Sequence, residues 1–152
     1  MRQQKSYKIL LIGDSCIDEY VYGTCERLNP EAPVPILKYG RKEIRKGMAW
    51  NVKENLTSFG LEVTMLTNEE DIFKTRYIDE KYNHQILRVD TEDKLNPLSS
   101  DIPNKVFDAL VISDYDKGFI TKDKLFELTF NSIIPVFIDS KKTYLPESNC
   151  FI

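Results

Sequence analysis

Four short apolar runs along the chain have the length and composition of strands buried in a parallel sheet. They cover residues 8–12, 62–67, 109–113 and 135–139. A further run, Cys150-Phe151-Ile152, resembles the opening of another such strand. Longer segments with helical periodicity separate some of these runs. This order predicts an α/β sheet that is mostly parallel, with right-handed crossovers.

Two of the separating segments, 48–59 and 121–133, are predicted helices. In the first, apolar residues recur at spacings of three and four, and Gly60 stands just past the last of them. In the second, Thr121 is a favourable N-cap residue. The first segment therefore carries a periodic apolar face, and each of the two segments has a residue that marks one helix end.

The middle of the chain has a different pattern. Residues 72–79 and 85–92 are two strand-like runs joined by the polar turn 80–84, and both contain charged residues. We expect a half-polar hairpin that protrudes from the main sheet. The proline-rich segment 29–35 leads into residues 36–39, which we expect to form an edge strand because proline cannot donate to a strand ladder.

Length and charge exclude several classes of protein. With 152 residues the chain corresponds to about one domain. Its 21 basic and 24 acidic residues give a net charge of 21 − 24 = −3, so it lacks the basic excess of a non-specific nucleic-acid binder. No apolar run is long enough to span a bilayer or to form a signal-peptide core. The three cysteines are odd in number and lack CxxC spacing, which is typical of a reducing compartment. We expect a cytoplasmic protein with no nucleic-acid or membrane partner.

Some common catalytic signatures are also excluded. His84 is the only histidine, which rules out sites that need two. The six glycines are never closer than seven positions apart, whereas a Walker A loop and a Rossmann fingerprint need closer spacing. A nucleotide site in this chain has to be built in another way.

Polar residues that follow the first strand and begin the first helix are the candidates for chemistry. Ligands of open α/β sheets bind beyond the carboxyl ends of strands, where Asp14 and Asp18 stand, and carboxylates there can accept hydrogen bonds from sugar hydroxyls. Gly47 would let a ligand approach the start of the helix, and Asn51 would offer it an amide. The alternatives are that Asp14 only binds backbone donors in a turn, that Gly47 only turns the chain, and that Asn51 is solvated.

Several stretches, in a fixed order along the chain, resemble the PfkB/ribokinase-type carbohydrate kinases. The closest resemblance is to the heptose 7-phosphate kinase domain of bacterial ADP-heptose synthases, in its N-terminal part only. The stretches are 12–20, 22–23, 27–35, 46–52, 86–90, 113–118 and 137–141. The resemblance implies a three-layer ribokinase-like core with a mostly parallel sheet and a small protruding β lid, whose strands cover about 33–46 and 72–92.

The resemblance also implies roles for particular residues. Asp18, Gly47 and Asn51 match positions that hold the sugar, Arg88 matches a lid-strand arginine near the sugar phosphate, and Lys141 matches a lysine on the nucleotide side. ATP and Mg²⁺ are the cofactors that the family implies. The lid strands imply a homodimer, because they are a dimer interface in many members. No metal ligand is expected among the residues of this chain.

The chain departs from the family pattern in three places. Met48 stands where the family has its second glycine, and only residues 68–71 connect 67 to 72, where the family has a helix and a strand. The family's Gly-Ala-Gly-Asp segment, with the catalytic aspartate, lies beyond residue 152, so the chain has no catalytic candidate of its own. We therefore expect residues 1–152 to form a single incomplete ribokinase-like domain, truncated at its C-terminus.

Two functional hypotheses follow. The first is the substrate-binding part of a sugar-phosphate kinase, which would act on a heptose- or hexose-type phosphosugar. Its C-terminal nucleotide half would come from a C-terminal partner chain or from a continuation of this chain, and residues 1–152 alone are expected to be inactive. The alternative is a non-catalytic module that binds a sugar phosphate or mediates dimerisation, and a decaying gene fragment is a third possibility.

Overall fold

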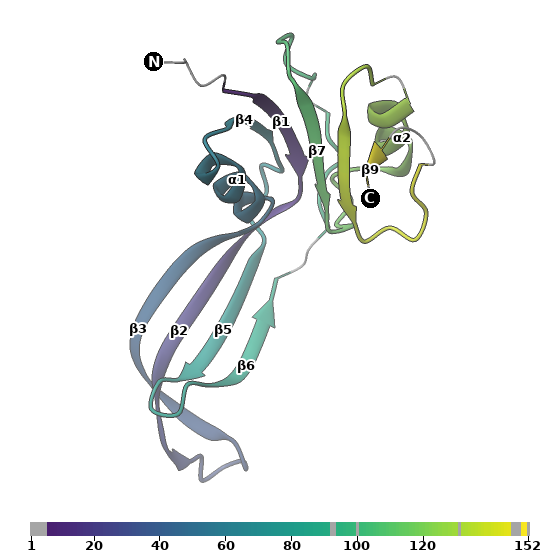
Figure 1. The fold of residues 1–152 in the computed structure, drawn as a ribbon. Coiled ribbons are helices and arrows are strands. Elements are labelled where there is room, and N and C mark those ends of the chain that lie inside the picture. The colour runs from purple at the N-terminus through teal and green to yellow at the C-terminus, as the bar shows by residue number, and fades with distance from the viewer. Residues whose placement is uncertain (1–5, 92–93, 100, 131, 147–149, 152) are drawn as a thin grey trace, which may run out of the picture. The chain divides into compact units, whose positions relative to one another are not determined.

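The computed structural model describes residues 6–91, 94–99, 101–130, 132–146 and 150–151. Contacts between residues divide the chain into two compact units (Figure 1). We call Met1–Ser15, Gly47–Asp71 and Asp93–Ile152 the core unit, and Cys16–Lys46 with Ile72–Glu92 the lid unit. The chain passes between the two units four times, so each unit is assembled from segments that are distant in sequence.

The core unit contains a parallel sheet with the strand order β4-β1-β7-β8-β9 (Figure 1). In register, Ile9 of β1 lies between Val63 of β4 and Ala109 of β7. The centre of the sheet is buried on both faces, and Leu11 and Ile12 are fully inaccessible to solvent. All predicted strands of this sheet are confirmed, within one or two residues at each end. They are β1 (Lys8–Gly13), β4 (Glu62–Leu66), β7 (Ala109–Asp114), β8 (Val136–Ser140) and β9 (Cys150–Phe151).

Two helices cover opposite faces of this sheet. Val52 of α1 (Ala49–Ser58) lines a cavity with Val111 of β7. Leu128 of α2 (Lys122–Phe130) lines another with the neighbouring strand residue, Leu110. Because successive residues of a strand point to opposite faces, α1 and α2 lie on different sides. The core therefore has the three layers expected for a ribokinase-like fold.

The ends of both helices follow from local sequence signals. The Thr121 hydroxyl accepts a hydrogen bond of 3.1 Å from the Lys124 N–H, as an N-cap residue does. Gly60 has a φ of +80° and donates its N–H to Thr57 O at 2.9 Å, which closes the C-terminal end of α1. The last residue of α2 is Phe130, short of the predicted 133; the Ser132 hydroxyl bonds to Ile134 O at 2.8 Å and turns the chain.

The lid unit is a four-stranded sheet with the order β3-β2-β5-β6 (Figure 1). The predicted hairpin is confirmed as β5 (Phe73–Asp79) and β6 (His84–Asp90), which pair in antiparallel fashion outside the core sheet. Residue 92, the predicted end of the second run, lies outside the described residues. The expected edge strand is confirmed as β3 (Pro35–Met48), which is longer than predicted.

One lid strand was not predicted from the sequence. β2 (Ser15–Leu28) has 14 residues and pairs in parallel with β5. One face of β2 carries Asp18, Tyr20 and Tyr22, and the other carries Ile17, Glu19 and Val21. Neither face is uniformly apolar, so the strand lacks a clear period-two signal. Within the described residues, no helix is long and apolar enough to cross a membrane.

Candidate functional site

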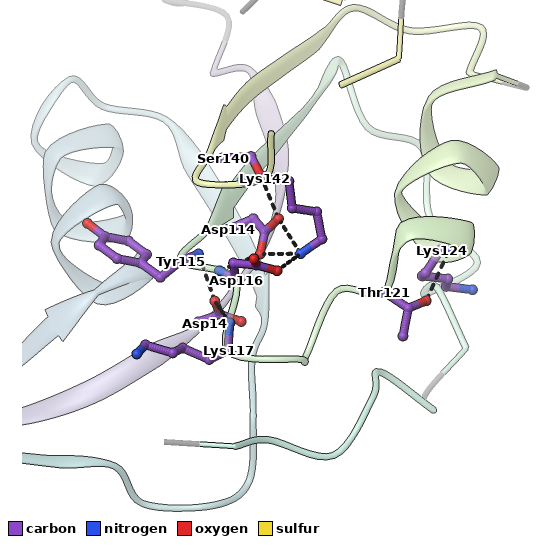
Figure 2. A network of polar contacts seen from close by, with 9 residues as sticks. All are labelled: Asp14, Asp114, Tyr115, Asp116, Lys117, Thr121, Lys124, Ser140 and Lys142. Atoms are coloured by element: carbon purple, nitrogen blue, oxygen red, sulfur yellow. Dashed lines mark hydrogen bonds and ion pairs between the residues drawn. The ribbon is translucent and has the colours of Figure 1, made fainter. Parts of the chain in front are cut away.

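Polar residues stand at the ends of three strands of the core sheet and take part in hydrogen bonds there (Figure 2). Asp14 directly follows β1, Asp114 is the last residue of β7, and Ser140 is the last residue of β8. In open α/β sheets this carboxyl edge is where ligands bind. The network at this edge is therefore the first candidate site.

The Asp14 side chain forms hydrogen bonds with the loop that follows β7. Its side chain is fully buried, and Oδ2 accepts hydrogen bonds from the N–H groups of Tyr115 (2.7 Å) and Lys117 (3.4 Å). Its other carboxyl oxygen, Oδ1, is buried and has no hydrogen-bond partner. Burial raises the pKa of Asp14, and the nearby charge of Asp114 adds to this, although the two backbone N–H groups lower it. This geometry matches the alternative in which Asp14 accepts hydrogen bonds from backbone N–H groups in a turn and does not bind a ligand.

The Lys142 ammonium group joins the ends of β7 and β8. Its Nζ lies 2.9 Å from Oδ2 of Asp114 and 2.6 Å from Oδ1 of Asp116, and Ser140 Oγ donates to Asp114 at 2.7 Å. The Asp114 side chain is completely buried. Burial lowers the pKa of Lys142, but the hydrogen bonds to Asp116 and Asp114 outweigh this, and the net shift is upward. Sequence reasoning did not find Lys142, and the pair Lys141-Lys142 was the only available signal.

Lys141 lies at the same edge but outside this ion-pair network. Its backbone N–H donates to Asp114 O at 2.9 Å, and its Nζ lies 4.9 Å from the centre of the Tyr115 ring. The side chain itself is exposed. The structure thus places this lysine at the carboxyl edge of the sheet with its ammonium group over an aromatic ring, and its nucleotide-side role stays a prediction.

The carboxylates at this edge do not fit a divalent metal ion. Asp114 and Asp116 both bind the Lys142 ammonium, which already balances their charge. Among the residues that the structure describes, no group of three metal-ligating side chains is close enough together to hold a metal. The network therefore offers no place for Mg²⁺ as it stands.

The start of α1 carries two further sequence candidates. Gly47 is buried and Asn51 is exposed in the first turn of the helix. Between them, Met48 has a φ of +59° and a ψ of −126°, a conformation that normally requires glycine. The Met48 side chain makes no capping hydrogen bond, and the Ala49 N–H bonds to Asp14 O at 2.9 Å. The backbone of Met48 thus has a glycine-like conformation although the residue is a methionine.

Gly13 allows α1 to pack closely against the end of β1. A Cβ added to Gly13 would lie 2.2 Å from Ser113 O and 3.0 Å from the Ala49 Cβ. The first distance is far below any real contact, so a side chain at this position would force the strand ends apart. Glycine at position 13 therefore determines how closely β1, β7 and α1 approach one another.

The remaining candidates, Asp18 and Arg88, lie in the lid unit. Asp18 Oδ1 forms an ion pair of 2.6 Å with Arg76 Nη1, and both side chains are largely buried. Arg88 binds Asp90 through two hydrogen bonds of 2.6 Å. The hydrogen bond to Asp90 raises the pKa of Arg88, and the charge of Asp18 contributes to the rise. Arg76, the partner of Asp18, was not singled out from the sequence.

The structure places the sequence candidates in two groups. Gly47, Asn51 and Lys141 belong to the core unit, whereas Asp18 and Arg88 belong to the lid unit. The expected convergence of the sugar-binding residues on one cleft spans both units, and it stays a prediction.

Known proteins resemble the chain in sequence and in structure. No family model matches the chain. The bifunctional protein HldE of a Nitratiruptor species is 31% identical over 173 residues, covering 90% of this chain and 37% of the relative. HldE of Helicobacter hepaticus is 34% identical over 160 residues, covering 80% of this chain and 33% of the relative. The chain thus spans about a third of the length of these curated relatives.

Solved structures show the same fold. Phosphofructokinase-2 from Escherichia coli, in complex with fructose-6-phosphate, superposes with a TM-score of 0.55 at 12% identity. The match covers 91% of this chain and 56% of that protein. Sequence and fold together confirm the resemblance inferred from the motifs: the chain resembles part of the bifunctional HldE proteins in sequence, and it shares the fold of phosphofructokinase-2.

Proposed function

We propose that this chain is the substrate-binding part of a sugar-phosphate kinase that transfers a phosphoryl group from ATP to a heptose- or hexose-type phosphosugar. The observation that carries the proposal is Asp18, a largely buried carboxylate of the lid sheet that binds the guanidinium of Arg76. Carboxylates accept hydrogen bonds from sugar hydroxyls, and guanidinium groups bind phosphate through paired N–H donors. A site with both groups suits a ligand with both hydroxyls and a phosphate.

Each candidate residue has a role in this proposal. Asp18 accepts a sugar hydroxyl, and Arg88 binds the phosphate that the sugar already carries. Asn51 offers its amide to the sugar at the start of α1, where Gly47 lets the ligand approach the backbone. Lys141 lies on the nucleotide side.

ATP supplies the transferred group, and Mg²⁺ would neutralise the charge that develops on it. Lys141 lies at the carboxyl edge of the sheet with an exposed side chain, and its ammonium group would hold an ATP phosphate. The carboxylates at this edge are already bound to Lys142, so we do not assign Mg²⁺ to them.

The described residues provide no convincing general base. Asp114 and Asp116 are held by Lys142, and Asp14 is buried against backbone N–H groups. A general base contributes about 10²–10⁴-fold to a rate, and binding of the ground state cannot replace it. We therefore propose that the chain needs a C-terminal partner chain for catalysis.

An apolar surface of the core unit suits such a partner. A cavity of about 300 Å³ is lined by Val52, Val111, Phe137 and Phe151, among others. Phe137 is 44% and Phe151 is 63% exposed, and their rings stack at 5.0 Å. Parallel sheets are normally covered on both faces, so an amphipathic helix of the partner fits this place.

The lid sheet suits self-association. Its face opposite Asp18 carries the row Val21, Tyr77 and Leu87 across three strands, and Leu87 is 53% exposed. We propose a homodimer that buries this row. The negative net charge gives no support for a nucleic-acid partner, and we place the protein in the cytoplasm without a membrane partner.

The test is an ATP-consumption assay with a panel of heptose and hexose phosphates, with and without a separately produced C-terminal fragment of an HldE relative. We expect the chain alone to consume no ATP. When the fragment is present, we expect ATP consumption that depends on the sugar phosphate. Turnover near ordinary kinase rates by the chain alone would overturn the need for a partner. Binding of a phosphosugar without turnover in either mixture would favour the alternative, a non-catalytic binding module.

A second measurement tests the site itself. Asp18→Ala should weaken phosphosugar binding by about 1–3 kcal/mol, the usual range for a hydrogen bond to a charged group. Glu31→Ala, which removes an exposed carboxylate of the same unit, is the matched control and should leave the affinity unchanged. Equal affinities of the Asp18→Ala variant and the unmodified chain in calorimetry would remove Asp18 from the site.

A further inference from the structure

The lid sheet gathers charged side chains in two adjacent rows across β2, β5 and β6. The strand register aligns Asp18, Lys74 and Asp90 in one row. It aligns Tyr20, Arg76 and Arg88 in the next row. Residues that are opposite in register, or two apart on one strand, point to the same face. These six side chains therefore share one face of the lid, and we call them the lid array.

The centre of the array contains two like charges. Arg76 and Arg88 stand directly opposite each other on neighbouring strands, an arrangement that is unfavourable unless anions compensate for it. Two carboxylates do so in this structure, since Arg76 binds Asp18 and Arg88 binds Asp90. The array as a whole contains three cations and two carboxylates.

The two ion pairs differ in their exposure to solvent. The side chains of Arg76 and Asp18 are 21% and 16% exposed, whereas those of Arg88 and Asp90 are 43% and 40% exposed. Electrostatic attraction is screened less where water is largely excluded, so the Arg76–Asp18 pair is held more firmly. The Arg76 guanidinium also lies 5.2 Å from the centre of the Tyr20 ring, which limits where it can move.

This pairing has a consequence for the proposed sugar site. Asp18 Oδ1 lies 2.6 Å from Arg76 Nη1 and is engaged in this ion pair. A sugar hydroxyl that approaches this oxygen has to compete with a guanidinium ion. A phosphate dianion can supply Arg76 with better acceptors, because its oxygens match the paired N–H donors of arginine.

We propose that Arg76 makes sugar recognition by Asp18 conditional on phosphate. The phosphate of the substrate binds between Arg76 and Arg88, and Asp18 Oδ1 is then available to a sugar hydroxyl. Arg76 thus determines specificity for phosphorylated over unphosphorylated sugars. The inference rests on the proposed function, and it adds a residue and a reason for the choice of substrate class.

The test compares three ligands by calorimetry with the full chain: a hexose 6-phosphate, the same hexose without phosphate, and inorganic phosphate. The unmodified chain should bind the phosphosugar at least tenfold more tightly than the free sugar. Arg76→Met should weaken phosphosugar and phosphate binding by roughly ten- to hundredfold, the range expected for one lost charged hydrogen bond. The same variant should bind the free sugar as well as the unmodified chain, or better, because Asp18 has lost its competitor.

Two further variants complete the design. Arg76→Lys keeps the charge but not the paired donors, and it should fall between the unmodified chain and Arg76→Met. Arg41→Met removes an arginine of the same sheet that stacks on Tyr22 and binds Glu80, outside the array, and it should change none of the three affinities. Thermal unfolding of each variant establishes that the lid is folded.

The outcomes separate this inference from the proposed function. If Arg76→Met weakens both sugars equally, Arg76 has only a structural role and the inference is wrong. If the variant leaves phosphosugar binding unchanged, the inference is also wrong, while the proposed function stands. If the unmodified chain binds no sugar or phosphosugar at all, the proposed function fails and the inference fails with it.

Discussion

Met48 illustrates how a single residue can keep a backbone conformation that its side chain disfavours. Its φ of +59° and ψ of −126° fall in a region that is open almost only to glycine, and a non-glycine residue there costs about 1–3 kcal/mol. The side chain is buried, with 4% of its surface exposed, and this burial offsets part of the strain. The motif resemblance predicts glycine at position 48, and the backbone conformation observed there gives the physical reason for it.

The strain at Met48 can be measured with two variants. Both Met48→Ala and Met48→Gly lose the buried side chain, but only glycine relieves the backbone. We expect the glycine variant to have the higher free energy of unfolding, by about 1 kcal/mol, in urea denaturation. At Glu54, an exposed position within α1, the order should be reversed, with alanine better by about 0.5–1 kcal/mol. The same order at both positions would disprove the strain.

Asp14 makes the stability of the core dependent on pH. Burial raises its pKa in the folded state, so the protonated carboxyl is favoured there. The stabilisation from the neutral form is fully present below the ordinary aspartate pKa of about 3.9, and it is lost as the pH rises through the folded value. Asp14→Asn has no such titration. The free energy of unfolding of this variant, relative to the unmodified chain, should therefore increase as the pH rises from about 4 towards neutrality.

Urea titrations at a series of pH values check this prediction. Asp101→Asn, which changes an exposed carboxyl, serves as the control and should show no comparable trend. A constant difference between Asp14→Asn and the unmodified chain over the whole pH range would show that Asp14 titrates normally.

At the scale of secondary-structure elements, the ends of β7 and β8 are joined by one buried ion pair. Asp114 is completely buried and Lys142 is 13% exposed, and the loop after β7 depends on this contact. Removing one partner of a buried pair leaves an uncompensated charge, which usually costs about 3–5 kcal/mol. The adjacent Lys141 is exposed, and the contact described above for its ammonium group is with the Tyr115 ring.

These two neighbours should therefore respond differently to the same substitution. We expect Lys142→Met to lower the free energy of unfolding by about 3 kcal/mol, and Lys141→Met to lower it by less than about 1 kcal/mol. Urea denaturation of the two variants measures both values. Similar losses for the two variants would contradict the importance of the Lys142–Asp114 pair.

At the scale of the whole molecule, exposed apolar residues of the lid support the proposed homodimer. Leu87 and Val89 of the lid are 53% and 47% exposed, although they are large apolar residues in a regular strand. A cluster of such residues on one sheet face is typical of a surface that another chain covers. This is the surface that we assign to the homodimer.

Sedimentation analysis tests this assignment. Leu87→Glu places a charge on the lid face and should convert a dimer to a monomer, whereas Tyr82→Glu, at an exposed position in the β5–β6 turn, should leave the dimer intact. Because Leu87 is already half exposed, the folded monomer should tolerate the charge. A monomeric unmodified chain, or a dimeric Leu87→Glu variant, would rule out this interface.

The sequence by itself determined the features that depend on short stretches of chain. Continuous apolar runs predicted the strands of the core sheet, and two strand-like runs around a polar turn predicted the β5–β6 hairpin. Apolar periodicity with Gly60 predicted α1, and the N-cap residue Thr121 indicated α2, because each of these signals is local. Motifs in a fixed order also led to the kinase resemblance that the comparisons confirm. β2 was missed because charged and aromatic residues interrupt the apolar positions, so neither of its faces is uniformly apolar.

Only the tertiary structure decided which charges pair. Asp18 binds Arg76, which is 58 positions away, and Asp114 binds Lys142, which is 28 positions away. These pairs depend on strand order and register, which are determined by the packing of the whole sheet rather than by any local pattern. For the same reason, the sequence identified Asp18 as a candidate but not the arginine that controls its availability, and it pointed to Lys141 rather than to the lysine beside it.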